Sequence, residues 1–222
     1  MTTRQETCYL TKSFLILGGG GHARVLIETL CSQEGIIEAI VAPELRQAPE
    51  FQGVKHLRHD NDVEAYKPAS IKLVNAIGSL PNDAKLREQL FKRFKAAGYS
   101  FATIVSSTAT LSKYVQLSEG SQILPRAILN ACEVGANTIV NTGAVVEHDV
   151  VIGSNCHIAP GAIICGNVSI GDNVHIGAGA VVIQGVSIAD GAIVGAGSVV
   201  KQNLSATSVH YPAKSFIKEG SE

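Results

Sequence analysis

The chain has 222 residues, of which 45% are hydrophobic and 17% are charged. Its 18 Lys and Arg residues nearly balance its 19 Asp and Glu residues, which leaves a formal net charge of −1. Because no basic stripe is available to neutralise a phosphate backbone, this composition argues against a nucleic-acid partner.

The cysteines and the N-terminal residues indicate the cellular compartment of the protein. Five cysteines are present and no two are spaced as C-x-x-C, so neither a disulfide framework nor a zinc ribbon is expected. Residues 1–12 lack the apolar core of a signal peptide. No apolar run approaches the roughly 18 residues that span a bilayer. We therefore expect a cytoplasmic protein without a membrane span.

A strand, a glycine-rich turn and a helix are predicted after an N-terminal tail of residues 1–12. Residues 14–17 form a short apolar run that leads into four consecutive glycines, 18–21, and His22. A helix should follow, because apolar side chains then recur at helical spacing. Its inner face is predicted to carry Val25, Leu26 and Leu30.

Two further strands and a second helix complete the first part of the chain. Residues 36–41 and 71–77 have the composition of strands, and Pro81 and Gly98 are placed to begin and end a helix. The face of this helix is predicted to carry Leu86, Leu90 and Phe94. Strands that alternate with helices predict a small, Rossmann-like parallel α/β domain over residues 13–100.

The glycine-rich turn is suited to a phosphate-bearing ligand, because backbone N–H groups can approach a phosphate closely there. Gly18, Gly20 and Ala23 also match a loose dinucleotide fingerprint. That fingerprint needs an acidic residue at the end of the second strand, and residues 41–43 offer none. A nicotinamide cofactor is therefore disfavoured, while a purely structural tight turn remains the alternative.

A repeat of six residues dominates the second part of the chain. Starting at residue 128, every sixth residue is a β-branched aliphatic: Ile128, Val134, Val140, Val146, Ile152, Ile158, Ile164, Ile170, Ile176, Val182, Ile188, Val194 and Val200. Four places after each of the first twelve aliphatics, the chain carries a small residue or Val. This period fits short strands separated by corners, three of which close a triangular coil of eighteen residues.

The pattern predicts a left-handed parallel β-helix over residues 101–204, with all thirteen aliphatics pointing inward. The repeat begins less regularly at Val105, and we attribute a slip of one residue to a corner at residues 124–126. Residues 105–200 should form about five coils. A solenoid needs its ends covered, so residues 205–222 are expected to be a C-terminal cap or tail.

His148 is the strongest candidate for catalysis in the repeat region. It lies two places after an inward aliphatic, on the outside of a coil, and Gly166 follows it by one full coil. A glycine stacked beside a histidine leaves room for a substrate, and imidazole is a suitable base near neutral pH. Asp149 or Glu147 could orient the ring. The alternative is an ordinary surface histidine.

Other reactive residue types in the repeat favour structural roles. His157 and His175 are eighteen apart and should stack on one edge, lining a wall or a subunit interface. A zinc site of the γ-class carbonic anhydrase kind would need a His-x-x-x-x-His pair, which the β-helix lacks. Cys132 and Cys156 occupy the small inward position, so we expect them to fill the core.

Two motifs taken together resemble a known family. A Gly-Gly-His turn at residues 20–22 is followed by a β-helix that carries Asn-Thr-Gly-x-x-Val-Glu-His-Asp at residues 141–149. From Phe14 to Lys214 the chain is similar to the sialic-acid O-acetyltransferase and nucleotide-aminosugar N-acetyltransferase family, whose members modify sugars for bacterial surface glycans. The resemblance implies an acetyl-CoA-dependent enzyme that needs no metal, and a homotrimer with each active site between two β-helices.

The resemblance also assigns roles to single residues. It implies that His148 is the general base and that Asp149 raises its basicity. The positions implied for acetyl-CoA are His157, the backbone amide of Gly166, Ala178 and Ala196. The positions implied for the nucleotide-sugar acceptor are Gly20, Gly21, His22 and Gly78.

The acceptor is the open question. The resemblance favours the amine of a nucleotide-linked 4-amino-deoxysugar, with O-acetylation of a sialic-acid-like free sugar and a non-catalytic sugar-nucleotide scaffold as alternatives. Many family members end the second strand with an acidic pair that helps to recognise the nucleotide. Here Ala42, Pro43 and Glu44 stand in its place.

Overall fold

The structure, a computed structural model, describes residues 13–79, 81 and 85–212 of the chain. The expected tail at residues 1–12 and the end of the expected cap, residues 213–222, lie outside the described part. The described residues form two units, 13–79 with 85–107 and 81 with 108–212. None of the helices among them is both long enough and apolar enough to cross a membrane.

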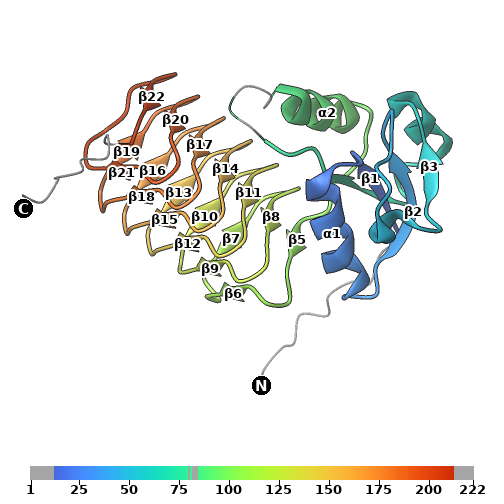
Figure 1. Ribbon diagram of the computed structural model, residues 1–222, viewed down its shortest axis with the longest axis horizontal. Coiled ribbons are helices and arrows are strands. Elements are labelled where there is room, and N and C mark those ends of the chain that lie inside the picture. The colour runs from blue at the N-terminus through green and yellow to red at the C-terminus, as the bar shows by residue number, and fades with distance from the viewer. Residues whose placement is uncertain (1–12, 80, 82–84, 213–222) are drawn as a thin grey trace, which may run out of the picture. The chain divides into compact units, whose positions relative to one another are not determined.

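The first unit is built on a small parallel sheet with the strand order β3-β2-β1-β4 (Figure 1). Its strands are β1 (Ser13–Leu17), β2 (Ile36–Val41), β3 (Lys55–Leu57) and β4 (Lys72–Asn75). Its helices are α1 (Gly21–Cys31) and α2 (Lys85–Ala96), with 3₁₀ turns at Pro49–Phe51 and Asp60–Ala65. The short strand β5 (Ile104–Val105) lies near its end.

Sequence periodicity located the two helices and three of the four strands in the sheet of this unit, and missed the edge strand β3. β3 has three residues, none of them fully buried, so it carries no hydrophobic pattern that could have predicted it. Helix α1 buries Ala23, Leu26, Ile27, Thr29 and Leu30, whereas Val25 is half-buried.

The predicted inner face of the second helix is wrong at one position. Leu86 is 43% exposed, and the neighbouring Arg87 is buried instead, together with Leu90 and Phe94. The guanidinium of Arg87 donates to the carbonyl oxygens of Asn75 (2.6 Å) and Ile77 (2.8 Å). Burial lowers the pKa of Arg87 to about 9. An arginine can replace an aliphatic side chain here because two backbone acceptors compensate for its desolvation.

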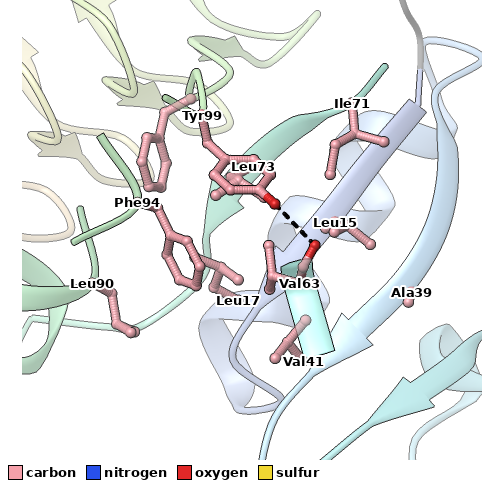
Figure 2. Close-up of a cluster of buried hydrophobic side chains, with 11 residues drawn as sticks. Leu15, Leu17, Ala39, Val41, Val63, Ile71, Leu73, Leu90, Phe94 and Tyr99 are labelled. Atoms are coloured by element: carbon pink, nitrogen blue, oxygen red, sulfur yellow. Dashed lines mark hydrogen bonds between the residues drawn. The ribbon is translucent and has the colours of Figure 1, made fainter. Parts of the chain in front are cut away.

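An apolar cluster fills the space beside the sheet (Figure 2). The ring of Phe94 meets that of Tyr99 edge-on, with centroids 5.7 Å apart. The Tyr99 hydroxyl donates to the carbonyl oxygen of Val63 at 3.1 Å, as Figure 2 shows. Helix α2 ends just before Gly98, whose φ of +86° closes the last turn, so the predicted end of this helix is confirmed.

The second unit is a left-handed β-helix of two-residue strands in three parallel sheets (Figure 1). The β7 sheet contains β7 (Gln116–Leu117), β10 (Glu133–Val134), β13 (Val151–Ile152), β16 (Ser169–Ile170) and β19 (Ser187–Ile188). The β8 sheet contains β8 (Gln122–Ile123), β11 (Ile139–Val140), β14 (His157–Ile158), β17 (His175–Ile176), β20 (Ile193–Val194) and β22 (Val209–His210). The β6 sheet contains β6 (Thr110–Leu111), β9 (Ile128–Leu129), β12 (Val145–Val146), β15 (Ile163–Ile164), β18 (Val181–Val182) and β21 (Val199–Val200).

The second residue of each strand points into the coil, as the period of six predicts. The twelve predicted aliphatics from Val134 to Val200 are all buried. Cys132 and Cys156 are buried with them, and desolvation raises the pKa of their thiols to about 11 and about 12. Both cysteines therefore fill the core. Coiling also continues past residue 204, because β22 pairs with β20.

The prediction for Ile128 is wrong, and so is the predicted place of the slip. Ile128 is 40% exposed, while Leu129 is completely buried and pairs with Val146. The slip lies at Asn130–Cys132, a corner of three residues, whereas the other corners up to strand β21 have four. Because this corner is one residue short, counting back by six from the inward Val134 reaches Ile128, the outward residue of its strand, and not the inward Leu129.

Candidate active site

His148 lies at the corner between strands β12 and β13, and its neighbour orients it. From residue 118 to residue 198, the third residue of each four-residue corner has a left-handed backbone, usually at Asn or Gly, and Asp149 takes that place with φ of 59°. Aspartate tolerates this conformation better than most residues. Its Oδ2 lies 2.8 Å from His148 Nδ1, so the ring donates from Nδ1 and keeps a lone pair on Nε2.

The same carboxylate adjusts the basicity of the ring. The hydrogen bond to Asp149 raises the pKa of His148 above its ordinary value, and the charge of Asp149 and then that of Glu147 add to the effect. The His148 side chain is 65% exposed, so a substrate can reach it. A solvent-exposed imidazole with an oriented ring and an open Nε2 can act as a general base.

Gly166 lies one coil further along and directly under the imidazole. A methyl group at this position would come within 2.8 Å of both Cε1 and Nε2 of His148, so only glycine leaves the ring where it is. None of the residues that the structure describes accepts a hydrogen bond from the Gly166 backbone N–H. The structure thus brings His148, Asp149 and Gly166 together, as their spacing predicted.

The short corner at Asn130–Cys132 lies on the other side of His148. The Asp149 N–H donates to the carbonyl oxygen of Ala131 at 3.0 Å, which stacks the two corners. The Asn130 amide donates to a carboxylate oxygen of Glu147 at 3.3 Å. His148 is therefore flanked by a corner that lacks a residue and by a glycine. Sequence reasoning missed this arrangement, because it placed the slip too early.

His157 and His175 stack on the outer face of the β8 sheet, as predicted. They are paired across β14 and β17, and their rings meet edge-on with centroids 5.1 Å apart. His157 is only 9% exposed, and its Nε2 lies 3.0 Å from the Asn141 amide nitrogen. Among the described residues, no group of three or more His, Cys, Asp or Glu side chains could hold a metal ion.

The two histidines implicated by the sequence lie on opposite sides of the β-helix. His148 occupies the corner between the β6 and β7 sheets, and His157 lies on the remaining face, the β8 sheet. Ala178 and Ala196 occupy equivalent, exposed places in successive coils, at the corner between the β8 and β6 sheets. One copy of the chain therefore does not bring His157 to His148.

A second candidate site lies in the first unit, at the carboxyl end of strand β1. A cavity of about 400 Å³ is bordered by apolar side chains and by a few charged ones. Its lining includes Gly18, Gly19, Gly20, Ala42, Pro43, Glu44, Leu45, Arg46, Asp60 and Leu86. The three residues that replace the acidic pair are thus in the wall. Sequence reasoning missed Arg46 and Asp60, because Arg46 lies in a loop and Asp60 begins a short 3₁₀ turn, and neither segment has a hydrophobic period that marks it.

The glycines of the turn differ in backbone conformation and in the space around them. Gly18 has φ of +113°, and a methyl group on Gly19 would meet the Leu45 side chain at 2.5 Å. Gly20 and Gly21 have open space where a side chain would lie, and so has Gly78, which follows strand β4. Strands β1 and β4 are adjacent and parallel. The residues that the resemblance implies for the acceptor therefore follow the carboxyl ends of two neighbouring strands: Gly20, Gly21 and His22 follow β1, and Gly78 follows β4.

Helix α1 begins within this glycine turn. Its N-cap residue is Gly20, which has no side chain to cap the helix, and its first residues are Gly21 and His22. The first turn carries no acidic residue. Its backbone N–H groups and the helix dipole favour an anion.

Comparisons with known proteins match both units. The family model described as bacterial transferase hexapeptide (six repeats) covers residues 131–166 and 167–202, and the PglD N-terminal domain model covers residues 13–94. No curated protein sequence matches.

Solved structures match over almost the whole chain. A histidine-to-alanine variant of GDP-perosamine N-acetyltransferase from Caulobacter crescentus, in complex with CoA and GDP-perosamine, is 33% identical over 94% of this chain and 97% of that chain, with a TM-score of 0.82. WeeI from Acinetobacter baumannii is 25% identical over 88% and 94%, with a TM-score of 0.76. The acetyltransferase domain of PglB from Neisseria gonorrhoeae, in complex with acetyl coenzyme A, is 24% identical over 93% and 100%, with a TM-score of 0.83, and shares the fold.

Proposed function

The chain belongs to the hexapeptide-repeat sugar acetyltransferases of the left-handed β-helix type, and from this premise we propose that it acetylates the amine of a nucleotide-linked 4-amino-deoxysugar with acetyl-CoA. The observation that carries the proposal is the exposed His148, oriented by Asp149 and lying over Gly166. The relative that is 33% identical is an N-acetyltransferase for a nucleotide-linked sugar. Such a product serves bacterial surface-glycan biosynthesis.

The chemistry follows from these three residues. The acceptor nitrogen attacks the thioester carbonyl carbon of acetyl-CoA while His148 Nε2 takes its proton. The carbon–sulfur bond then breaks, and CoA leaves as the thiolate. Asp149 stabilises the imidazolium that forms, and the Gly166 N–H is available to stabilise the developing oxyanion. A donor in that role contributes about 2.7–4 kcal/mol of transition-state stabilisation.

The first unit would bind the nucleotide. Phosphate oxygens accept hydrogen bonds from the N–H groups at the start of α1, where Gly20 and Gly21 leave room for them. Gly78 leaves similar room on the adjacent strand. The cavity beside this turn has apolar walls for a planar base and the charged groups of Arg46 and Asp60 for its polar edges.

The positions of the two histidines support a homotrimer. In one copy His157 lies on the face opposite the His148 corner, so His157 can serve the same reaction only if another copy supplies it. Ala178 and Ala196 would line the path of the coenzyme between copies. A ring of three gives every copy the same two neighbours, and so three equivalent sites.

An aliphatic stripe on the outer face of the β6 sheet supports the same assembly. The outward residues of five successive strands are in register: Ile128, Val145, Ile163, Val181 and Val199. Ile163 is 40% exposed and Val199 is 47% exposed. Such a continuous apolar surface is suited to burial against a neighbouring copy.

The free cysteines and the acetyl-CoA donor fit a cytoplasmic location.

An assay with several acceptors tests the function. Labelled acetyl-CoA is incubated with the protein and either amino-sugar nucleotides or free sugars, including a sialic acid. Transfer to an amino-sugar nucleotide supports the proposal. Transfer only to a free sugar hydroxyl would replace it with O-acetylation, and absence of transfer to the whole panel would favour a binding scaffold. Light scattering at micromolar concentration tests the trimer, and a monomer would contradict it.

A further inference from the structure

Asn141 contacts His157 but was not assigned a role by the sequence. It follows strand β11, whose Ile139 pairs with His157 across the β8 sheet. Its backbone N–H donates to the carbonyl oxygen of Ile158 at 2.8 Å, which holds it against the strand that carries the histidine. The side chain of Asn141 is therefore placed by the regular ladder of the β-helix.

The orientation of the Asn141 amide is determined by its other hydrogen bond. Its Oδ1 accepts from the backbone N–H of Thr142 at 2.7 Å. A backbone nitrogen can only donate, so the atom facing it must be the oxygen. The amide NH₂ group is then the atom that lies 3.0 Å from His157 Nε2.

This orientation defines the proton positions on the imidazole. An amide NH₂ group donates and cannot accept, so Nε2 of His157 must present its lone pair. The ring is then neutral, with its single proton on Nδ1. An imidazolium would set an N–H group against the NH₂ group of Asn141. The edge-on ring of His175, at a centroid distance of 5.1 Å, restricts rotation of the ring away from this arrangement.

We infer that Asn141 is a positioning residue that holds His157 as the neutral Nδ1–H tautomer, so that His157 acts on acetyl-CoA as a hydrogen-bond donor and cannot act as a base through Nε2. The action on acetyl-CoA rests on the proposed function, whereas the tautomer does not. His148 carries its proton on the same nitrogen, because Asp149 accepts from Nδ1. The two histidines differ at Nε2, whose lone pair is open in His148 and occupied in His157.

Nitrogen NMR of the full-length protein tests the tautomer without any substrate. Long-range ¹H–¹⁵N correlation of the histidine rings distinguishes a protonated Nδ1 from a protonated Nε2, and the His157 signals are assigned from their loss in His157→Gln. We expect a neutral ring with the proton on Nδ1 near neutral pH. A proton on Nε2, or an imidazolium, would overturn the inference.

Substitution of Asn141 tests the positioning role. In Asn141→Leu the constraint is lost and the Nε2–H form should become populated, while in Asn141→Asp the carboxylate should draw the proton to Nε2. Calorimetry should show acetyl-CoA binding weakened by about tenfold in both, as expected for a lost positioned hydrogen bond. Asn203→Ala is the control, because the Asn203 amide oxygen accepts from the Ser187 backbone N–H, in coils far along the β-helix from Asn141.

The outcomes separate this inference from the proposed function. Unchanged His157 signals in both Asn141 variants, or unchanged acetyl-CoA binding despite changed signals, would overturn the positioning role. Absence of acetyl transfer by the wild-type protein would count against the proposed function alone, because the NMR and calorimetric results do not need an acceptor.

Discussion

The interior of the β-helix and the edge that carries His148 follow opposite rules. In the interior, twelve aliphatics recur every six residues and every one of them is buried. At the edge, the informative residues are exceptions to the repeat. Asp149 occupies a place usually held by Asn or Gly, and the corner stacked against it one coil earlier, Asn130–Cys132, is one residue short.

The difference follows from what each region must achieve. A buried column gains about 1.5–3 kcal/mol for each aliphatic that is removed from water, so regular spacing is favoured at every coil. A site for acyl transfer needs space, a base and an oriented carboxylate at one corner only. Periodicity therefore indicates the fold, and departures from periodicity indicate where chemistry can take place.

The largest effect is expected from a charge placed in the column. Ile164→Asp should prevent folding, because an unpaired buried carboxylate costs several kcal/mol, a large part of a typical stability of about 5–15 kcal/mol. Its neighbour Ile163 lies on the outside of the same strand, so Ile163→Asp should fold but fail to assemble. Circular dichroism and light scattering measure the two properties.

The control for these variants is Val151→Asp. Val151 is also an outward aliphatic, 47% exposed, but it lies on the β7 sheet among polar neighbours. It should keep both fold and assembly. A folded Ile164→Asp protein would disprove the assignment of the inner column.

The next largest effect is expected at the edge. His148→Ala should lower kcat by roughly 10²–10⁴-fold, the usual consequence of losing a positioned general base. Its melting temperature and its affinity for acetyl-CoA should stay near those of the wild type, because the side chain is 65% exposed and outside the column. His157→Ala should instead act mainly through KM for acetyl-CoA. Near-normal turnover in His148→Ala, with turnover abolished in His157→Ala, would show that the base has been misassigned.

A smaller effect is expected from filling the space beside the base. In Gly166→Ala the new methyl group must displace the His148 ring, because it would lie 2.8 Å from Nε2. We expect kcat to fall by about tenfold, since misplacement of a catalytic group costs rate without loss of the fold. In a His148→Ala background the same substitution should cause no further loss. A loss of equal size in both backgrounds would mean that the methyl group acts on something other than the ring.

The sequence predicted the β-helix and nearly all of its inner column correctly, but it did not predict where the repeat loses a residue. The period of six was sufficient for the inner column, but the slip was placed at residues 124–126 although it lies at Asn130–Cys132. The error arose because Ile128 and Leu129 are both apolar, and the spacing alone cannot show which of two adjacent aliphatics faces inward. Only the pairing of Leu129 with Val146 decides it.

In the first unit, sequence reasoning missed what tertiary contacts determine. Leu86 fits the apolar face of a helix, yet Arg87 is buried, because the carbonyl oxygens of Asn75 and Ile77 accept from it. No local pattern signals such a partner. For the same reason the contribution of Arg46 to the cavity could not be foreseen. The contact of Asn141 with His157 is similar, since it joins residues sixteen apart in adjacent coils.

The smallest expected effect concerns the pH dependence of the reaction. The hydrogen bond to Asp149, and then its charge, raise the pKa of His148. Because the base works as the neutral ring, kcat/KM should fall as the pH drops through this raised pKa.

In Asp149→Asn the charge is removed while an oxygen remains to accept from Nδ1. The substitution also suits the backbone, since Asn occupies the same left-handed place at residues 137, 155, 167 and 173. The pKa of His148 should therefore fall, and the acidic limb of the profile should move to lower pH. At the plateau the weaker base should cost less activity than His148→Ala does. Rates measured between about pH 5 and pH 9 check both effects. An acidic limb that stays in place or moves to higher pH would show that Asp149 does not control the protonation of the base.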